Sequence, residues 1–249
     1  MKILAIETAT EACSAALLMS DTQVISDESV ISKIKNNKTD KSKIITRFQL
    51  APREHTKLIL PMLDKVLEEA NIQLSEVDAI AFGRGPGAFT GLRIAAGVAQ
   101  GVALSVDKPV IPVSTLAALA LQASEQADYN QNKTIVVALD ARMGEIYWGS
   151  FVLKNRTIEP MGEEQVSKLE YILNDIGDES IIAIGNGWEV SNEKLPENIN
   201  VIEDCLPSAQ YIARLALPLL IAEKTVAVED AQPVYIRNNV AKKSVKQKT

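Results

Sequence analysis

The residues with the clearest chemical potential form a glycine-rich stretch. It runs Gly83-Arg84-Gly85-Pro86-Gly87-Ala88-Phe89-Thr90-Gly91-Leu92-Arg93. Glycine permits positive φ angles and close backbone approach, and Thr90 is placed to cap a helix that would follow. Because a helix N-terminus presents free amide N–H groups to an anion, the stretch favours a phosphate-binding interpretation.

Two phosphate-binding motifs can be compared with this stretch. A Walker loop requires lysine directly after its last glycine, but the only lysine nearby is Lys108. The dinucleotide pattern is met weakly by Gly83, Gly85 and Ala88, but Pro86 interrupts it and no acidic residue ends the next predicted strand. The motifs therefore argue against both kinds of nucleotide site.

The remaining candidates for catalysis are few. His55 is the only histidine, which excludes a zinc site built from two or three imidazoles of this chain. A serine–histidine or cysteine–histidine pair would have to use His55, which we expect to cap or pack instead. Cys13 and Cys205 form no disulfide framework and are expected to be small core residues. We therefore predict no catalytic residue and no metal site.

Composition limits the class of protein further. The 249 residues carry a formal net charge of -6 at pH 7, which argues against a large nucleic-acid surface. A lysine-rich tail at 242–248 is interpreted as a solvated terminus. The N-terminus lacks the apolar region of a signal peptide, and no apolar run reaches the ~18 residues expected of a membrane span. We expect a cytoplasmic protein without a membrane segment.

Hydrophobic patterning predicts the elements that must position these residues. Strands at 2–7, 12–19 and 23–31 would form an antiparallel meander, followed by an exposed polar loop at 32–43. Alternating elements are expected next: helix 58–70 despite Pro61, strand 77–82, helix 91–105, strand 110–113 and helix 115–123 capped by Ser114. The second half predicts strand 135–139, its hairpin partner 145–153, strand 181–184, helix 209–222 and the extended segment 233–237. This order indicates two related α/β lobes, at 1–108 and 109–249.

The helix predicted at 91–105 is unusual because small residues surround Gly97 and Gly101. Each glycine inside a helix costs on the order of 1 kcal/mol relative to alanine, so close packing against another backbone should offset the pair. A helix that is apolar all round belongs either to a core or to a partner interface, and both alternatives stay open. Leu58 and Leu60 widen the apolar face of the helix at 58–70 in the same way.

The glycine-rich stretch, together with Ala99-Gln100-Gly101, resembles the signature of the TsaB (YeaZ) family, the B subunits of bacterial tRNA threonylcarbamoyladenosine synthase. Further segments agree in order and spacing: 6–17, Arg53-Glu54-His55, 112–116, 140–148 and 233–237. The resemblance covers nearly the whole chain, and the insertion at about 32–45 is its main departure. It implies an α/β fold of the two-lobed actin-like ATPase (RNase H-like) type, with mixed sheets flanked by helices.

The resemblance also implies a degenerate nucleotide cleft. The positions that match the nucleotide loops of this fold are Glu7, Thr8, Asp140, Arg142, Gly185 and Gly187. Glu7 stands where an aspartate usually supports magnesium, and Ala141 and Met143 lack hydroxyl groups, which weakens a site that depends on tight octahedral geometry. The expectation is that no cofactor is required and that nucleotide binding is weak. The catalytic paralogue of the family holds a metal with a His-x-x-x-His helix, which this chain lacks.

The partners implied by the resemblance are those of a non-catalytic scaffold subunit. The complex would install threonylcarbamoyl on N6 of the adenosine next to the tRNA anticodon, with chemistry in the catalytic paralogue, an ATPase as third subunit, and a homodimer of the isolated chain. The expected interface residues on the two helices are Leu58, Ile59, Met62, Leu63, Val66, Leu92, Ala95, Ala96, Ala99, Val102 and Ala103. The alternatives are an active phosphotransferase with Asp140 as base and, more remotely, a cysteine or metal peptidase.

Overall fold

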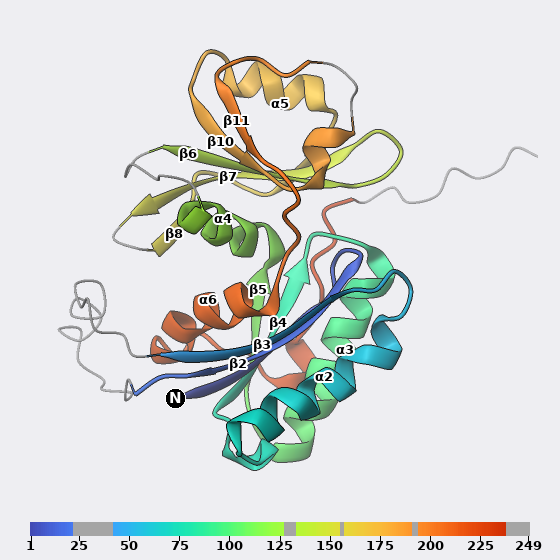
Figure 1. Cartoon of the computed structure of the whole chain (residues 1–249), viewed down its shortest axis with the longest axis vertical. Coiled ribbons are helices and arrows are strands. Elements are labelled where there is room, and N and C mark those ends of the chain that lie inside the picture. The colour runs from blue at the N-terminus through green and yellow to red at the C-terminus, as the bar shows by residue number, and fades with distance from the viewer. Residues whose placement is uncertain (22–41, 127–132, 155–156, 191–193, 238–249) are drawn as a thin grey trace, which may run out of the picture.

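The computed structural model describes residues 1–21, 42–126, 133–154, 157–190 and 194–237, and it contains two mixed sheets (Figure 1). The first sheet consists of β1 (Lys2–Glu7), β2 (Ala12–Met19), β3 (Lys43–Leu50), β4 (Ala79–Gly85) and β5 (Val110–Ser114). Its spatial order is β3-β2-β1-β4-β5. The first three strands are antiparallel neighbours, whereas β4 and β5 run parallel to β1.

The second sheet repeats this arrangement. Its strands are β6 (Thr134–Asp140), β7 (Ile146–Lys154), β8 (Thr157–Pro160), β10 (Ile181–Ile184) and β11 (Ile199–Ile202), with β9 (Gln165–Ser167) paired to β7. The order is β11-β10-β6-β7-β8, with an antiparallel hairpin on one side of β6 and parallel strands on the other. The sheets define a first and a second lobe of the same topology.

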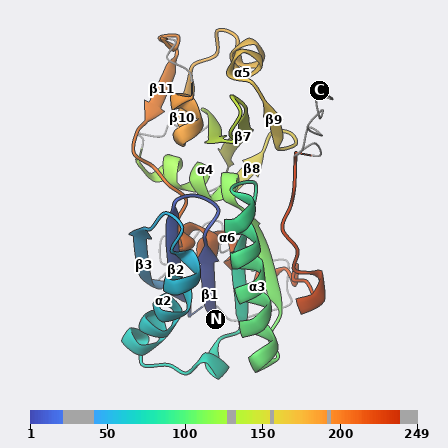
Figure 2. The same cartoon turned by 90° about the vertical axis from the view of Figure 1, so that its right-hand side faces the viewer.

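Helices cover both faces of each sheet. On the outer face of the first sheet lie α2 (His55–Ala70) and α3 (Phe89–Val106), and α5 (Leu169–Ile176) covers the outer face of the second (Figures 1 and 2). Between the sheets lie α4 (Thr115–Gln126) and α6 (Ala209–Ile221). Each of these two helices packs mainly on the sheet of the other lobe. Helix α4 follows β5 of the first sheet but contacts β6 of the second, and α6 follows β11 of the second sheet but contacts β1 of the first. Short 3-10 turns occur at η1 (Leu74–Glu76), η2 (Asn186–Glu189) and η3 (Val228–Asp230).

Burial on both faces explains the apolar composition of the central strands. In β1, Ile3 and Ala5 belong to the core between the sheets, whereas Leu4 and Ile6 pack under the outer helices. Successive side chains of a strand point to opposite faces, so a strand covered on both sides needs an unbroken apolar run.

Most of the expected elements are confirmed to within a few residues, including the helix through Pro61, which begins at His55. The Ser114 cap is confirmed, since its Oγ accepts the Ala117 N–H at 3.0 Å. The strand predicted at 23–31 and most of the 32–43 loop lie outside the described residues. The strand that pairs with β2 is β3, at residues 43–50, where no strand was predicted. The elements α5, β8, β9 and β11 were also not predicted.

The predicted division at residue 108 does not follow the sheets. Strand β5 pairs with β4 in the first sheet, and Val226 forms a bridge with Val110. Because α6 also covers the first sheet, segments from both halves of the chain complete the first lobe.

The expectation that no segment could cross a membrane is wrong for α3 when judged by length and composition alone. Its 18 residues have a mean hydropathy of 1.3. The same helix has its buried face in the first lobe, where Leu92, Ala95 and Ala99 pack against the sheet. That packing accounts for part of its apolar character.

Candidate functional site: the cleft between the lobes

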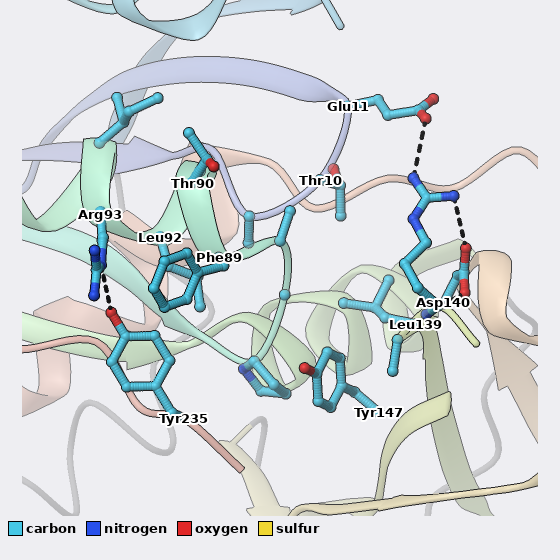
Figure 3. Close-up of a pocket in the computed structure, with 18 of the residues that line it drawn as sticks. Thr10, Glu11, Phe89, Thr90, Leu92, Arg93, Leu139, Asp140, Tyr147 and Tyr235 are labelled. Atoms are coloured by element: carbon cyan, nitrogen blue, oxygen red, sulfur yellow. Dashed lines mark hydrogen bonds and ion pairs between the residues drawn. The ribbon is translucent and has the colours of Figure 1, made fainter. Parts of the chain in front are cut away.

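A cleft of about 1240 Å³ opens between the two lobes. The turn after β1, the N-termini of α2 and α3, the end of β6 with the turn that follows it, and the C-terminal segment 234–237 all line it (Figure 3). Two groups of labelled side chains stand on opposite sides of this cleft in Figure 3: Arg93 with Phe89 and Tyr235, and Glu11 with Asp140.

The glycines of the glycine-rich stretch serve close packing against the β1–β2 turn. A Cβ atom added at Gly87 would lie 2.5 Å from the Ala9 carbonyl oxygen, and one at Gly91 would lie 1.9 Å from that of Thr8. The Ala88 N–H donates to the Ala9 carbonyl at 2.7 Å, and the Thr8 hydroxyl donates to the Gly91 carbonyl at 2.8 Å. The stretch therefore seats the turn on the start of α3, and the phosphate-cradle interpretation is not needed to explain its glycines.

Other residues of the glycine-rich stretch shape its turn or connect the two lobes. The predicted Thr90 cap is wrong, because α3 begins at Phe89 after Ala88, and no side chain caps it. Gly85 adopts a φ of 100°, a value that favours glycine, and Pro86 follows it through a cis peptide bond. Arg84 donates to Glu164 of the second lobe at 3.2 Å, and that carboxylate also accepts the Ser114 hydroxyl.

The Glu7 carboxyl group is buried inside the first lobe and does not line the cleft. Its Oε1 accepts the Ala9 N–H at 2.6 Å and its Oε2 accepts the Thr115 hydroxyl at 2.9 Å. A Cβ at Gly83 would lie 2.0 Å from Oε2, so that glycine provides the space for the carboxyl group. Burial raises the pKa of Glu7 to about 7 despite these hydrogen bonds. The neighbouring Cys13 thiol, whose pKa burial and Glu7 raise to about 11, stays protonated at neutral pH.

On the far side of the cleft, Arg142 joins carboxylates of both lobes. It pairs with Asp140 at 3.1 Å and with Glu11 at 3.7 Å (Figure 3). Asp140 also accepts the Arg142 backbone N–H at 2.7 Å, and its own N–H donates to the Asn186 side chain at 3.1 Å. Asp140, the alternative candidate for a phosphotransferase base, is thus paired with the side chain of Arg142 and hydrogen-bonded to its backbone. Within the described parts of the chain, no group of three His, Cys, Asp or Glu residues is arranged to hold a metal.

The other residues of the expected nucleotide cleft are structural. Thr8 is buried, and Gly185 and Gly187 pack against β6, where an added Cβ would lie 2.2 Å from the Ala138 carbonyl oxygen and 2.7 Å from its carbonyl carbon. Of the six positions, only Asp140 and Arg142 line the cleft. His55, which was expected to cap or pack, is buried, and its Nε2 lies 2.9 Å from the Thr10 carbonyl oxygen.

Two cleft residues, Phe89 and Tyr235, were not predicted as site residues from the sequence, and Arg93 was predicted only as part of the glycine-rich turn. Phe89 and Tyr235 have ring centroids 5.4 Å apart, and the Arg93 guanidinium lies 3.9 Å from the centroid of Phe89. Arg93 Nε also donates to the Tyr235 hydroxyl at 3.2 Å. In the sequence, Phe89 is visible only as a member of the glycine-rich stretch. A phenylalanine in the first turn of a helix of small residues is the signal that could have drawn attention to the cluster.

The expected partner-facing residues need a correction. Most of them are buried in the first lobe and cannot contact another protein in this arrangement: Ile59, Met62, Leu63, Val66, Leu92, Ala95, Ala96, Ala99 and Ala103. Leu58 and Val102 are partly exposed. The outward positions of the same helices are instead Leu60 and Leu104, 51% and 72% exposed, and Gly97 and Gly101, near which an added Cβ would meet no atom within 4 Å.

The repeated sheet order, with helices on the outer faces and an exchanged pair between, defines a two-lobed actin-like fold with a cleft between its lobes. A family model described as TsaD, tRNA N6-adenosine threonylcarbamoyltransferase, matches residues 34–245. Two curated relatives are named tRNA threonylcarbamoyladenosine biosynthesis protein TsaB. The Escherichia coli protein is 38% identical over 98% of each chain, and the Haemophilus influenzae protein is 36% identical over 98% of this chain and 97% of its own.

A solved structure, YeaZ from Pseudomonas aeruginosa, is 35% identical with a TM-score of 0.76, over 94% of this chain and 100% of that chain. The chain belongs to the TsaB (YeaZ) family.

Proposed function

We propose that this chain is a non-catalytic subunit of the machinery that installs threonylcarbamoyl on N6 of a tRNA adenosine. It would hold the catalytic paralogue through the outward faces of α2 and α3. The names of the TsaB relatives support the pathway, and the match to the TsaD family model supports a partner of related fold. The paralogue would carry the chemistry, an ATPase subunit would join the pair, and tRNA would be bound by the complex.

The observation that carries the proposal is the outward position of Gly97 and Gly101. Two glycines in a helix cost on the order of 1 kcal/mol each relative to alanine, and no atom of the described chain approaches them. A helix of another protein could pack there with its backbone close to α3. Leu104 and Leu60 would supply apolar contact on either side.

The cleft supports a non-catalytic role. Asp140 is paired with Arg142, and Glu7 is turned into the first lobe. The residues at the expected nucleotide positions therefore do not form a magnesium–phosphate site of tight geometry. We infer that the chain needs no cofactor for its own folding or binding, and that nucleotide affinity at these positions is weak.

Substitutions on α3 test the proposed interface. We expect Gly97→Leu and Leu104→Glu to abolish co-purification with the paralogue and to slow tRNA modification in a reconstituted system. The melting temperature of the isolated chain should stay within about 2 °C, because both side chains project outward. Tyr171→Ala on the distant α5, where Tyr171 is 62% exposed, serves as a matched control and should retain the partner.

Two results would count against the proposal. Unchanged co-purification of both α3 variants would remove the interface, and a normal modification rate without this chain would remove the role. In the isolated chain, the same face is expected to pair with a second copy, so the variants should also sediment as monomers.

A further inference from the structure

We propose that Phe89, Arg93 and Tyr235, together with Arg53, form a binding site for single-stranded RNA in the cleft. The ligand chemistry is a nucleotide unit, in which a base stacks on the aromatic rings and neighbouring phosphates pair with the two arginines. The source that the site fits best is an RNA strand rather than a free nucleotide.

The aromatic part of the site is assembled but incompletely covered. Phe89 stays 49% exposed and Tyr235 44% exposed, although their ring centroids are only 5.4 Å apart. Arg93 contacts both rings: its guanidinium lies over Phe89 and its Nε donates to the Tyr235 hydroxyl (Figure 3). Half-exposed rings fixed by an arginine form a platform on which any base can stack.

The charge of the cleft favours an anion. Its lining includes four arginines but only two carboxylates, in a chain whose formal net charge is -6. Arg142 is neutralised by Asp140 and Glu11, and Arg237 is paired with Glu145. In the part of the chain that the structure describes, Arg53 and Arg93 form no ion pair with a carboxylate. These two guanidinium groups are therefore available to phosphates.

The position of the site favours a strand that extends beyond the cleft. Arg53 precedes α2 and Phe89 begins α3, so the site adjoins the same two helices whose outward faces form the proposed partner interface. The chain that follows Arg237 carries four lysines in its last residues, which suit a polyanionic backbone. The choice of an RNA strand over a free nucleotide rests on this position and on the proposed role in tRNA modification.

The experiment is fluorescence anisotropy of the full chain with a labelled single-stranded RNA of about 10 nucleotides. We expect Tyr235→Ala and Arg93→Gln each to raise the Kd roughly tenfold, and Tyr235→Phe to keep most of the affinity because the ring remains. Tyr171→Ala, an exposed tyrosine outside the cleft, should leave the Kd unchanged. Melting temperatures confirm that each variant is folded.

Each alternative outcome overturns the inference. If AMP competes with the RNA at equal concentration of nucleotide, the site is a mononucleotide site. If removal of residues 238–249 abolishes binding while Tyr235→Ala does not, the tail binds RNA and the cluster does not. Co-purification of Tyr235→Ala with the paralogue is measured in parallel, so that loss of RNA binding with a retained partner leaves the proposed function intact.

Discussion

At the scale of single residues, the structure of the site depends on the space that individual glycines leave free. Gly83 makes room for a buried carboxyl group, and Gly91 makes room for the backbone of the β1–β2 turn. The sequence indicated a tight turn before a helix, which is correct, but it suggested a ligand where the structure has packed backbone. The spacing of glycines cannot distinguish these cases, because the atom that each glycine admits comes from a distant part of the chain.

Two glycines of α3 give a matched pair for testing this explanation. We expect Gly91→Ala to lower the free energy of unfolding by about 2–3 kcal/mol, because its Cβ would lie 1.9 Å from the Thr8 carbonyl oxygen. Gly97→Ala should raise it by up to about 1 kcal/mol, since the added methyl group meets no atom and alanine favours the helix. Urea unfolding of both variants measures the difference; equal effects would contradict the packing explanation.

The buried Glu7 carboxyl group predicts a dependence of stability on pH. Its pKa rises from the usual 4.5 to about 7 on folding because of burial. Below pH 4.5 the carboxyl group is protonated in both the folded and the unfolded chain. Between pH 4.5 and about 7 only the unfolded chain releases the proton, so the free energy of unfolding falls as the pH rises. Above pH 7 this loss is complete and amounts to roughly 3 kcal/mol.

The variant Glu7→Gln should remove this loss, because its amide cannot ionise and can still accept from Ala9 and donate to Thr115. Unfolding free energies of both proteins across pH 4 to 8 provide the measurement. Parallel curves for the two proteins would show that the carboxyl group does not titrate as argued.

At the scale of elements, α3 has one face in the core and one face outward, and its composition does not show which face is which. Ala99 faces the sheet and Gly97 faces outward, although both lie in one uninterrupted apolar run. Such a run fixes the existence of the helix, but not which side meets the core, because no polar stripe marks the exposed face. An Ala99→Glu substitution would consequently bury a charge and report on folding instead of on the interface.

The same limit explains the elements that sequence patterns missed. Strand β3 lies at the edge of the first sheet, and four of its eight residues are polar, so it lacks the unbroken apolar run that marked β1. It forms because β2 offers a free edge along its full length. The site residues Arg53 and Tyr235 were missed for a related reason: only the fold brings the start of α2 and the C-terminal segment to one cleft.

At the scale of the whole molecule, the two lobes are joined by their exchanged helices. The alternation of strands and helices was enough to indicate two related α/β halves, and the repeated sheet order agrees with that expectation. The exchange was not predictable from local patterns, because α4 and α6 are apolar on faces that would suit either sheet. The boundary predicted at residue 108 would separate β5 from the first sheet, in which it pairs with β4.

The exchange predicts that neither half folds alone. A fragment of residues 1–126 would contain the complete first sheet but lack α6, and its α4 would lack the second sheet. We expect this fragment to show no cooperative thermal transition and to be cleaved rapidly by trypsin. Co-expression with residues 127–249 should restore a protease-resistant complex, whereas a cooperative melt of the first fragment alone would disprove the dependence.

The position of α6 has a consequence for biosynthesis. The last strand of the first sheet ends at Ser114, and the helix that covers the sheet begins at Ala209. At about 5–20 residues per second, a ribosome needs roughly 5 to 20 s to make the intervening chain. Throughout that interval the apolar inner face of the first sheet lacks α6. We therefore expect the nascent polypeptide to depend on chaperones that shield exposed hydrophobic surface until translation of α6 is complete.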